Sequence, residues 1–318
     1  MRALAIVLVG LGTAGLLVAA LAFVGRSEPP PPEFRGASRA PVPDESPCPG
    51  GRPPTPLADR VDEDRTFALL REQVELGPRP AGSDASRRLA EGIRRLLPNG
   101  RLEEIDARGP DGRPLRNVIG AVRGRDPIRL VVVGAHYDTK DLPGFVGAND
   151  GAGGTAAVVS LARSIRPGQL APTVVFVLFD GEEAPPDPLR QDVERYGLRG
   201  SRAAARDYAA RGAAAMILLD FVADRNLSIP REANSTPALW EELRAAAARV
   251  GVGCAFPVAT QPAVTDDHVP FLKSGVPAID LIDFTYPCWH RRCDDLSSVS
   301  KRSLDASSEA VYELLARL

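Results

Sequence analysis

Histidine is scarce in this chain of 318 residues, which contains only three, and methionine and tryptophan occur twice each. An excess of basic charge is also absent, because 39 Lys and Arg oppose 41 Asp and Glu to leave a net charge of -2. A nucleic-acid-binding protein would show a basic surplus, so the composition argues against nucleic acid as a partner. The remaining composition, 44% hydrophobic and 25% charged, is that of an ordinary globular protein.

Cysteine is sparse as well, with four residues: Cys48, Cys254, Cys288 and Cys293. An even number permits two disulfides in a protein that leaves the cytoplasm. Four cysteines allow three pairings, and the sequence does not select one of them. Free or buried thiols are the alternative interpretation.

Charge is missing from Ala3 to Val24, between Arg2 and Arg26. A run of this length can span a bilayer as a helix. A basic start followed by an apolar stretch is equally typical of a secretory signal peptide, and Ala-Leu-Ala at 20–22 offers a small-residue cleavage site. The sequence therefore predicts a signal peptide or a membrane anchor over residues 1–26. Either one predicts an extracytoplasmic location, secreted or anchored to the membrane by the N-terminal helix.

Residues 27–60 are rich in proline and contain few large apolar side chains. A segment of this composition cannot bury enough surface to fold by itself, so we interpret it as an extended linker. We therefore expect residues 1 to about 55 not to pack on the domain that follows.

Residues 61–318 have the pattern of one α/β domain. Helical stretches alternate with short runs of Val, Ile and Leu, several of them nearly continuous as in strands buried on both faces. This alternation predicts a largely parallel sheet with helices on both sides. The predicted strands lie at 117–122, 128–135, 173–180, 214–220 and 278–283, and the predicted helices at 65–76, 84–98, 151–165, 200–212 and 236–250, with Ser83 or Asp84 as the N-cap of the second helix.

Side chains that can bind a ligand follow these strands. In sheets of this kind ligands bind at the carboxyl ends of the strands, so we expect these side chains to converge on one edge. Each of them alone has an ordinary structural reading as a turn, a solvated corner or a helix cap. The set comprises His136, Asp138, Asp180, Glu182, Glu183, Asp220, Asp283 and His290, together with Asp150 before a glycine-rich helix start.

Glu182 and Glu183 are adjacent, and two carboxylates so close repel unless a cation or a proton separates them. Zinc accepts the mixture of imidazole and carboxylate ligands found on this edge. With a metal, one glutamate can be a ligand while its neighbour carries protons. The residue pattern therefore predicts a zinc site.

At these positions the chain resembles the co-catalytic zinc aminopeptidases and their relatives, the glutaminyl cyclases. The resemblance rests on GAHYD, GANDGAGG, FDGEE, LLD at 218–220, DDHVPFL, and WH at 289–290, and it runs from about Arg65 to the C-terminus. It implies an α/β/α sandwich with a central mixed, mostly parallel sheet. It also implies a cis peptide bond between Asp150 and Gly151.

The resemblance implies roles for individual residues. Asp150, Glu183 and His290 would bind zinc, and Glu182 would be the general acid and base. In the two-metal aminopeptidases a second zinc would lie on His136 and Asp220, with Asp150 bridging, so the chain would hold one zinc or two. Asp138 would orient His136 from the second shell, and His268 would be structural.

Several features favour the cyclase branch. Asp266 stands where the aminopeptidases usually have an uncharged residue, and in cyclases this acid shares a hydrogen-bond network with the position of Asp220. Trp289 matches a tryptophan of the cyclase pocket, although core packing is its alternative reading, and Tyr286 lies near an aromatic position of that pocket. The segment after the glutamates is also long. There are departures: Asp280 replaces a histidine of animal cyclases, and the disulfide cysteines and one pocket tryptophan of those enzymes have no counterpart.

The resemblance therefore implies a zinc-dependent glutaminyl-peptide cyclotransferase, which converts the N-terminal glutamine of peptides or proteins to pyroglutamate and releases ammonia. Glu182, Asp220 and Asp266 would be catalytic, and Trp289 and Tyr286 would bind substrate. A two-zinc aminopeptidase is the alternative. A non-catalytic binding domain is a third reading, disfavoured because the chain keeps every candidate ligand and Glu182.

Overall fold

The computed structural model describes residues 47–318 except 188 and 191. The predicted signal peptide or anchor and most of the predicted linker lie outside the described residues. Within them, no helix is both long enough and apolar enough to cross a bilayer.

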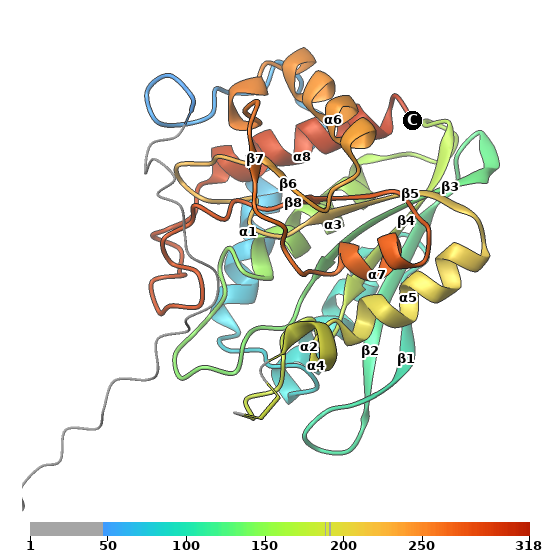
Figure 1. Cartoon of the computed structure of the whole chain (residues 1–318), viewed down its shortest axis with the longest axis vertical. Coiled ribbons are helices and arrows are strands. Elements are labelled where there is room, and N and C mark those ends of the chain that lie inside the picture. Colours follow the sequence, from blue (N-terminus) through green and yellow to red (C-terminus); the bar gives the residue numbers. More distant parts are fainter. Residues whose placement is uncertain (1–46, 188, 191) are drawn as a thin grey trace, which may run out of the picture. The chain divides into compact units, whose positions relative to one another are not determined.

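A six-stranded sheet in the order β1-β2-β4-β3-β5-β8 forms the centre of the fold (Figure 1). Four neighbouring strands, β4, β3, β5 and β8, run parallel, whereas β2 is antiparallel to both β1 and β4. The strands are β1 (Arg101–Arg108), β2 (Pro114–Val122), β3 (Asp126–His136), β4 (Pro172–Phe179), β5 (Ala213–Leu219) and β8 (Ala278–Leu281). The predicted mixed, mostly parallel sheet is confirmed.

Helices cover both faces of this sheet. Successive side chains of a strand point to opposite sides, and in the inner strands both sets are apolar and must be covered. On β4, Val174, Phe176 and Leu178 join one apolar core, and Val175, Val177 and Phe179 join the other. The first core contains residues of α1 (Glu63–Glu75), α2 (Asp84–Leu96), α3 (Ala152–Ser164), α6 (Pro237–Arg249) and α8 (Lys301–Leu315). The second contains residues of α5 (Arg199–Ala210) and α7 (His268–Lys273). The fold is therefore the predicted α/β/α sandwich.

Side-chain caps fix where several helices begin. Asp62, Ser83 and Ser300 each accept a hydrogen bond from the backbone N–H three residues later, at the starts of α1, α2 and α8. Ser83 is thus the cap of the second helix, one of the two predicted candidates. The structure adds elements that the sequence analysis does not predict: β1, α8, the two-stranded sheet of β6 (Arg231–Glu232) and β7 (Thr260–Gln261), and the short turns α4 (Val193–Tyr196) and η1 (Gly253–Ala255).

Two disulfides form, which the cysteine count permits, and they pair Cys48 with Cys254 and Cys288 with Cys293. The first corrects the expectation that residues up to about 55 stay off the domain. Cys48 is 3% exposed and belongs to the first core, because its disulfide attaches the proline-rich segment to η1. The linker interpretation therefore fails for residues 47–55.

Candidate metal centre

The candidate residues gather at the edge formed by the carboxyl ends of β3, β4, β5 and β8, which we call the rim. His136 is the last residue of β3, the two glutamates follow β4, and Asp220 follows β5. His290 lies in the long connection between β8 and α8. Because these strands are parallel, their carboxyl ends meet at one edge and bring residues distant in sequence together.

Asp150 is shared by two groups of side chains that could each hold a metal ion. In one group, His136 Nε2 lies 3.3 Å from Asp150 Oδ1 and 3.2 Å from Asp220 Oδ1. In the other, His290 Nε2 lies 3.5 Å from Asp150 Oδ2 and 3.1 Å from Glu183 Oε1. The structure thus brings together all five of the residues predicted to bind metal.

The donor atoms of this cluster fit a cation. Asp150 is 2% exposed, and its buried Oδ2 has no hydrogen-bond partner among the described residues. A buried carboxylate oxygen without a partner is costly, and a cation between Asp150 and His290 would remove that cost. Imidazole nitrogen with carboxylate oxygen is a donor set that zinc accepts.

The imidazole of His136 is oriented for ligation. Its Nδ1 donates to the backbone carbonyl of Asp138 at 3.0 Å, which leaves Nε2 facing the two carboxylates. The predicted orienting contact from the Asp138 carboxylate is replaced by this carbonyl, since Oδ1 lies 3.8 Å away. The carboxylate instead accepts the N–H groups of Gly181, Glu182 and Glu183. Asp138 therefore organises the loop that carries both glutamates.

The backbone turns sharply after Asp150 through a glycine. Gly151 has a φ of 96°, and a Cβ at this position would lie 2.8 Å from the carbonyl oxygen of Asp138. The described residues contain no cis peptide bond. The predicted cis bond between Asp150 and Gly151 is therefore wrong for this structure, where the positive φ of the glycine makes the reversal.

The two adjacent glutamates have opposite electrostatic surroundings. Burial raises the pKa of Glu182 well above its usual value, and the negative charge of Glu183 raises it further. Burial alone would also raise the pKa of Glu183, but His290 and Lys140 outweigh it and hold that pKa well below its usual range. The two surroundings thus push the pKa values of the adjacent carboxyls apart, as in many active sites that pair two acids.

Lys140 is a member of this site that the sequence analysis missed. Its Nζ lies 2.7 Å from Glu183 Oε2, opposite the oxygen that faces His290. A lysine four residues after a strand-end histidine carries no distinguishing pattern. Its place on the same loop as His136 was the one available signal.

A small cavity of about 70 Å³ opens beside these residues. Glu182 and Asp266 line it together with the five candidate metal ligands, and apolar side chains form most of the rest of the lining. Burial, and next the charge of Asp266, raise the pKa of Asp220 well above its usual value. The apolar wall consists of Val193, Phe221, Val264, Ile282, Phe284 and Trp289.

The two predicted substrate-binding aromatic residues lie in different places. Trp289 is 42% exposed, lines the cavity and stacks on His290 with ring centroids 4.6 Å apart, so it is not a core residue. Tyr286 is 1% exposed and is not among the lining residues. Its hydroxyl is engaged by Asp294 and Ser298, each at 2.6 Å. The structure therefore corrects the placement of Tyr286, which lies behind the site.

His268 is away from the metal cluster, as expected. It is fully buried, and its Nε2 lies 3.2 Å from Glu232 Oε1.

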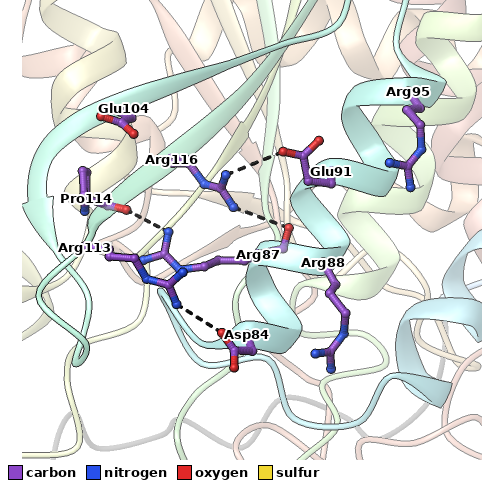
Figure 2. Close-up of a pocket in the computed structure, with 9 residues that line it drawn as sticks. All are labelled: Asp84, Arg87, Arg88, Glu91, Arg95, Glu104, Arg113, Pro114 and Arg116. Carbon is purple, nitrogen blue, oxygen red and sulfur yellow. Dashed lines mark hydrogen bonds and ion pairs between the residues drawn. The ribbon is translucent and has the colours of Figure 1, made fainter.

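A larger hollow of about 780 Å³ lies between α2 and the β1–β2 hairpin and contains none of the rim residues (Figure 2). Its arginines are largely paired with neighbouring acids, such as Arg87 with Asp111 at 3.2 Å. This arrangement is typical of a solvated surface network.

The sequence model of peptidase family M28 matches residues 117–315, which is more than half of the chain. The chain belongs to peptidase family M28. The match covers His136, Asp150, Glu183, Asp220 and His290, so the whole metal cluster lies within the family's region.

Relatives in this family include cyclases. A glutaminyl-peptide cyclotransferase of Bothrops jararaca is 30% identical over 219 residues, covering 57% of this chain and 60% of that protein. The chain thus spans about three fifths of the length of such curated relatives.

Solved structures show the same fold. The glutaminyl cyclase of Porphyromonas gingivalis superimposes with a TM-score of 0.71 at 29% identity, covering 82% of this chain and 99% of that one. A Zn-dependent exopeptidase of Parabacteroides distasonis does so with a TM-score of 0.69 at 25% identity, covering 82% and 100%. A glutaminyl cyclase and a zinc-dependent exopeptidase therefore share this fold.

Proposed function

We propose that this protein is a zinc-dependent glutaminyl-peptide cyclotransferase that acts on the N-terminal glutamine of peptides or proteins. The observation that carries the proposal is the third acid, Asp266, in the same small cavity as Glu182 and Asp220. Hydrolysis of a peptide bond has no evident need for it. The similarity to glutaminyl cyclases from several organisms supports the same assignment.

The metal would be held by Asp150, Glu183 and His290. When bound there, zinc supplies a Lewis acid for the substrate's amide carbonyl. The ion pair with Lys140 keeps Glu183 ionised and therefore able to act as a ligand. The free Oδ2 of Asp150 points to the same place.

The cavity would hold the glutamine side chain folded back toward its own α-amine. The substrate then carries both reacting groups, and most of the catalytic advantage comes from holding them together. Trp289, Phe284 and Ile282 form an apolar side to this cavity that limits the access of water. A narrow pocket with a few convergent polar groups is the usual form of a small-substrate site.

Glu182 would move the proton. It lines the cavity beside the metal cluster and belongs to neither group of candidate ligands. It takes a proton from the α-amine as the new C–N bond closes the ring, and it gives that proton to the side-chain amide nitrogen, which leaves as ammonia when the amide C–N bond breaks. Asp220 and Asp266 would hold the departing nitrogen through a shared proton.

The test is release of ammonia and pyroglutamate from a glutaminyl peptide, measured beside release of leucine from a leucyl peptide. Dominant ammonia release with one zinc per chain supports the cyclase. The second candidate, a two-zinc aminopeptidase, is favoured by the group of His136, Asp150 and Asp220, which can hold a second ion. Leucine release with two zincs, and no pyroglutamate, would establish the peptidase instead.

We also propose that the domain works outside the cytoplasm. Both disulfides support this location, because such bonds persist in oxidising compartments and are rare in the cytosol. Fractionation of cells that express the full chain tests it, and reduced protein recovered from the cytosolic fraction would refute it.

A further inference from the structure

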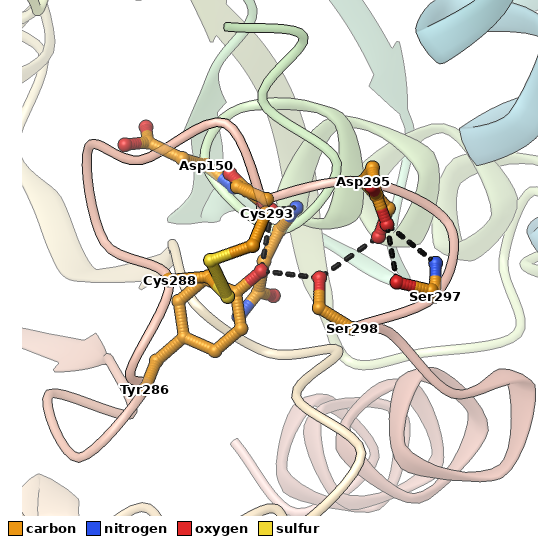
Figure 3. Close-up of a disulfide and its surroundings, with 9 residues drawn as sticks. Asp150, Tyr286, Cys288, Cys293, Asp295, Ser297 and Ser298 are labelled. Atoms are coloured by element: carbon orange, nitrogen blue, oxygen red, sulfur yellow. Dashed lines mark hydrogen bonds between the residues drawn. A yellow bond between two sulfur atoms is a disulfide. The ribbon is translucent and has the colours of Figure 1, made fainter.

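The segment that carries His290 is closed into a ring twice. The disulfide between Cys288 and Cys293 encloses four residues, among them Trp289 and His290 (Figure 3). Just outside it, the hydroxyl of Tyr286 donates to Asp294 Oδ1 at 2.6 Å. The two closures are nested, so the ends of this short loop are fixed both by a covalent bond and by a buried hydrogen bond.

Asp294 joins this loop to the other half of the metal cluster. Its Oδ1 accepts the N–H of Asn149 at 2.7 Å, and its Oδ2 accepts the N–H of Asp150 at 3.1 Å. Its carbonyl also accepts the N–H of Ala148. Asp294 is fully buried, so water does not compete for these bonds. The residue directly after the disulfide thus holds the backbone of the shared ligand Asp150.

His290 requires such support because of its backbone. Its φ is 52°, in the left-handed region that residues other than glycine rarely occupy. Packing gives the loop little help, since Arg291, Arg292 and Cys293 are all exposed. The covalent closure therefore supplies a constraint that apolar burial does not supply here.

We propose that the Cys288–Cys293 disulfide and Asp294 form a positioning clamp for the metal centre, which sets the separation between His290 on one loop and Asp150 on the other. The inference rests on the proposed metal centre but not on the reaction performed there. Opening the disulfide lets His290 leave its left-handed conformation, and weakening Asp294 lets the two loops separate. Either change lowers the affinity for metal, as loss of groups that orient ligands generally does.

The disulfide of the clamp is also accessible to reductants in solution. Cys293 is exposed and Cys288 half-buried, whereas Cys48 in the other disulfide is 3% exposed. A dithiol reductant in the medium would reduce the Cys288–Cys293 bond to two thiols and be oxidised to its own disulfide. Mild reduction should therefore reproduce the effect of removing these two cysteines.

The experiment measures zinc affinity directly, by competition between the purified full chain and a chromogenic chelator. For the double variant C288S/C293S we expect affinity to fall about 10- to 100-fold, the range seen when supporting groups are lost. Wild-type protein under mild reduction should match it. Unchanged affinity in the double variant would overturn the role of the disulfide.

The second variant is Asp294→Asn, which keeps the side-chain shape but replaces one accepting oxygen with a donor that faces a backbone N–H. We expect it to lower zinc affinity about tenfold. It should also lower the melting temperature of the zinc-free protein, because a buried donor is left facing a backbone N–H, so affinities are compared at a temperature where both proteins are folded. The matched control is Asp295→Asn, because Asp295 Oδ1 accepts only from Ser297 in its own turn (Figure 3). Equal affinity in both aspartate variants would overturn the role of Asp294.

The same preparations separate this inference from the proposed function. Zinc affinity that depends on the clamp, in a protein that releases leucine and forms no pyroglutamate, would overturn the cyclase and support the clamp. Cyclase activity with a zinc affinity insensitive to all these variants would overturn the clamp and support the cyclase.

Discussion

Buried acids on α8 and buried acids at the rim differ in how their negative charge is balanced by neighbouring groups. On α8, Glu309 is fully buried, and its carboxylate accepts the backbone N–H groups of Arg60 and Val61 and pairs with the Arg60 guanidinium at 2.9 Å. At the rim, Asp150 and Asp266 are 2% and 3% exposed. Asp150 Oδ2 has no hydrogen-bond partner among the described residues, and the charges of both acids raise the pKa of neighbouring Asp220, after burial. The charge of Glu309 is balanced by donors of the chain, whereas these two acids crowd another carboxyl group.

This difference distinguishes carboxylates that stabilise the folded structure from carboxylates that bind metal, protons or substrate. A buried carboxylate with its hydrogen bonds made fastens the segments that donate them, here the start of the domain to its last helix. A buried carboxylate without partners costs stability and persists where a metal, proton or substrate makes use of it. Neutralising the first kind should therefore unfold the protein, and neutralising the second should inactivate it.

The largest effect is expected at Glu182. Changing it to Gln removes the proton carrier but no candidate ligand, so turnover of a glutaminyl peptide should fall about 10²- to 10⁴-fold. Zinc content should remain that of wild type, and stability should not decrease, because a half-buried acid crowded by Glu183 has been neutralised. Ammonia release, metal analysis and urea unfolding check the three expectations.

The control for this variant is Glu183→Gln, one residue away. Glu183 belongs to the candidate metal group, so this change should release zinc as well as abolish turnover. If E182Q loses zinc to the same extent as E183Q, the division of roles between the two glutamates is wrong.

The next effect concerns Glu309. Changing it to Ala leaves the N–H groups of Arg60 and Val61 without their acceptor, and we expect a loss of about 2–4 kcal/mol of unfolding free energy. Zinc affinity of the folded protein should be unchanged. Glu313→Ala is the matched control on the same helix. The Glu313 carboxylate pairs with the side chains of Arg60 and Arg317 and accepts no backbone N–H among the described residues, so its loss should cost less than about 1 kcal/mol. If both variants lose the same unfolding free energy, the backbone hydrogen bonds of Glu309 contribute nothing beyond a surface ion pair.

The sequence predicts the inner strands and most helices, since their apolar patterns are strong. It misses β1 because RLEEIDAR is mostly charged and buries only Ile105. It misses α8 because several polar side chains of that helix are buried, including Asp305 and Glu309, so no clean apolar stripe marks it. Both failures occur where tertiary contacts, and not local pattern, decide the structure.

The candidate site shows the same division. His136, Glu183 and Asp220 can be predicted because each lies at or just after the end of a parallel strand, where such positions come together. Asp150 can be predicted from the glycine-rich helix start that follows it, and His290 from the resemblance that the WH motif carries. Lys140 and Asp294 cannot, because their roles are contacts between loops that no spacing encodes. Tyr286 does not line the cavity for a related reason, since nearness to an aromatic position of the cyclase pocket does not fix which side of the loop faces the cavity.

A smaller effect is expected at Asp266. Changing it to Asn should slow cyclisation about 10- to 100-fold, which is the loss of one supporting acid rather than of the proton carrier. The folded protein should become slightly more stable, because the charge of Asp266 raises the pKa of Asp220, after burial, and does the same for Asp267 and Asp280. Kinetics with a glutaminyl peptide and urea unfolding test both parts. A variant that loses activity and more than about 1 kcal/mol of stability would place Asp266 with Glu309 among the acids that hold the fold.

The smallest effect is expected at Asp305, which lies one helical turn before Glu309 but lacks the matching donors. Burial, and next the charge of Glu309, raise the pKa of Asp305 to about 7. An acid whose pKa is about 3.9 when unfolded and higher when folded binds its proton more tightly in the folded state. Its stabilising contribution is therefore complete below about pH 4 and is lost as the pH rises toward 7, above which the stability no longer changes through this group.

Asp305→Asn should remove this dependence of stability on pH. The variant should be more stable than wild type at pH 8 by about 1 kcal/mol, a value reduced by solvent screening at the edge of the helix. Unfolding in urea at pH 5 and at pH 8 measures both values. If wild type and the variant lose the same unfolding free energy between pH 5 and pH 8, the carboxylate of Asp305 is stabilised by its surroundings as that of Glu309 is.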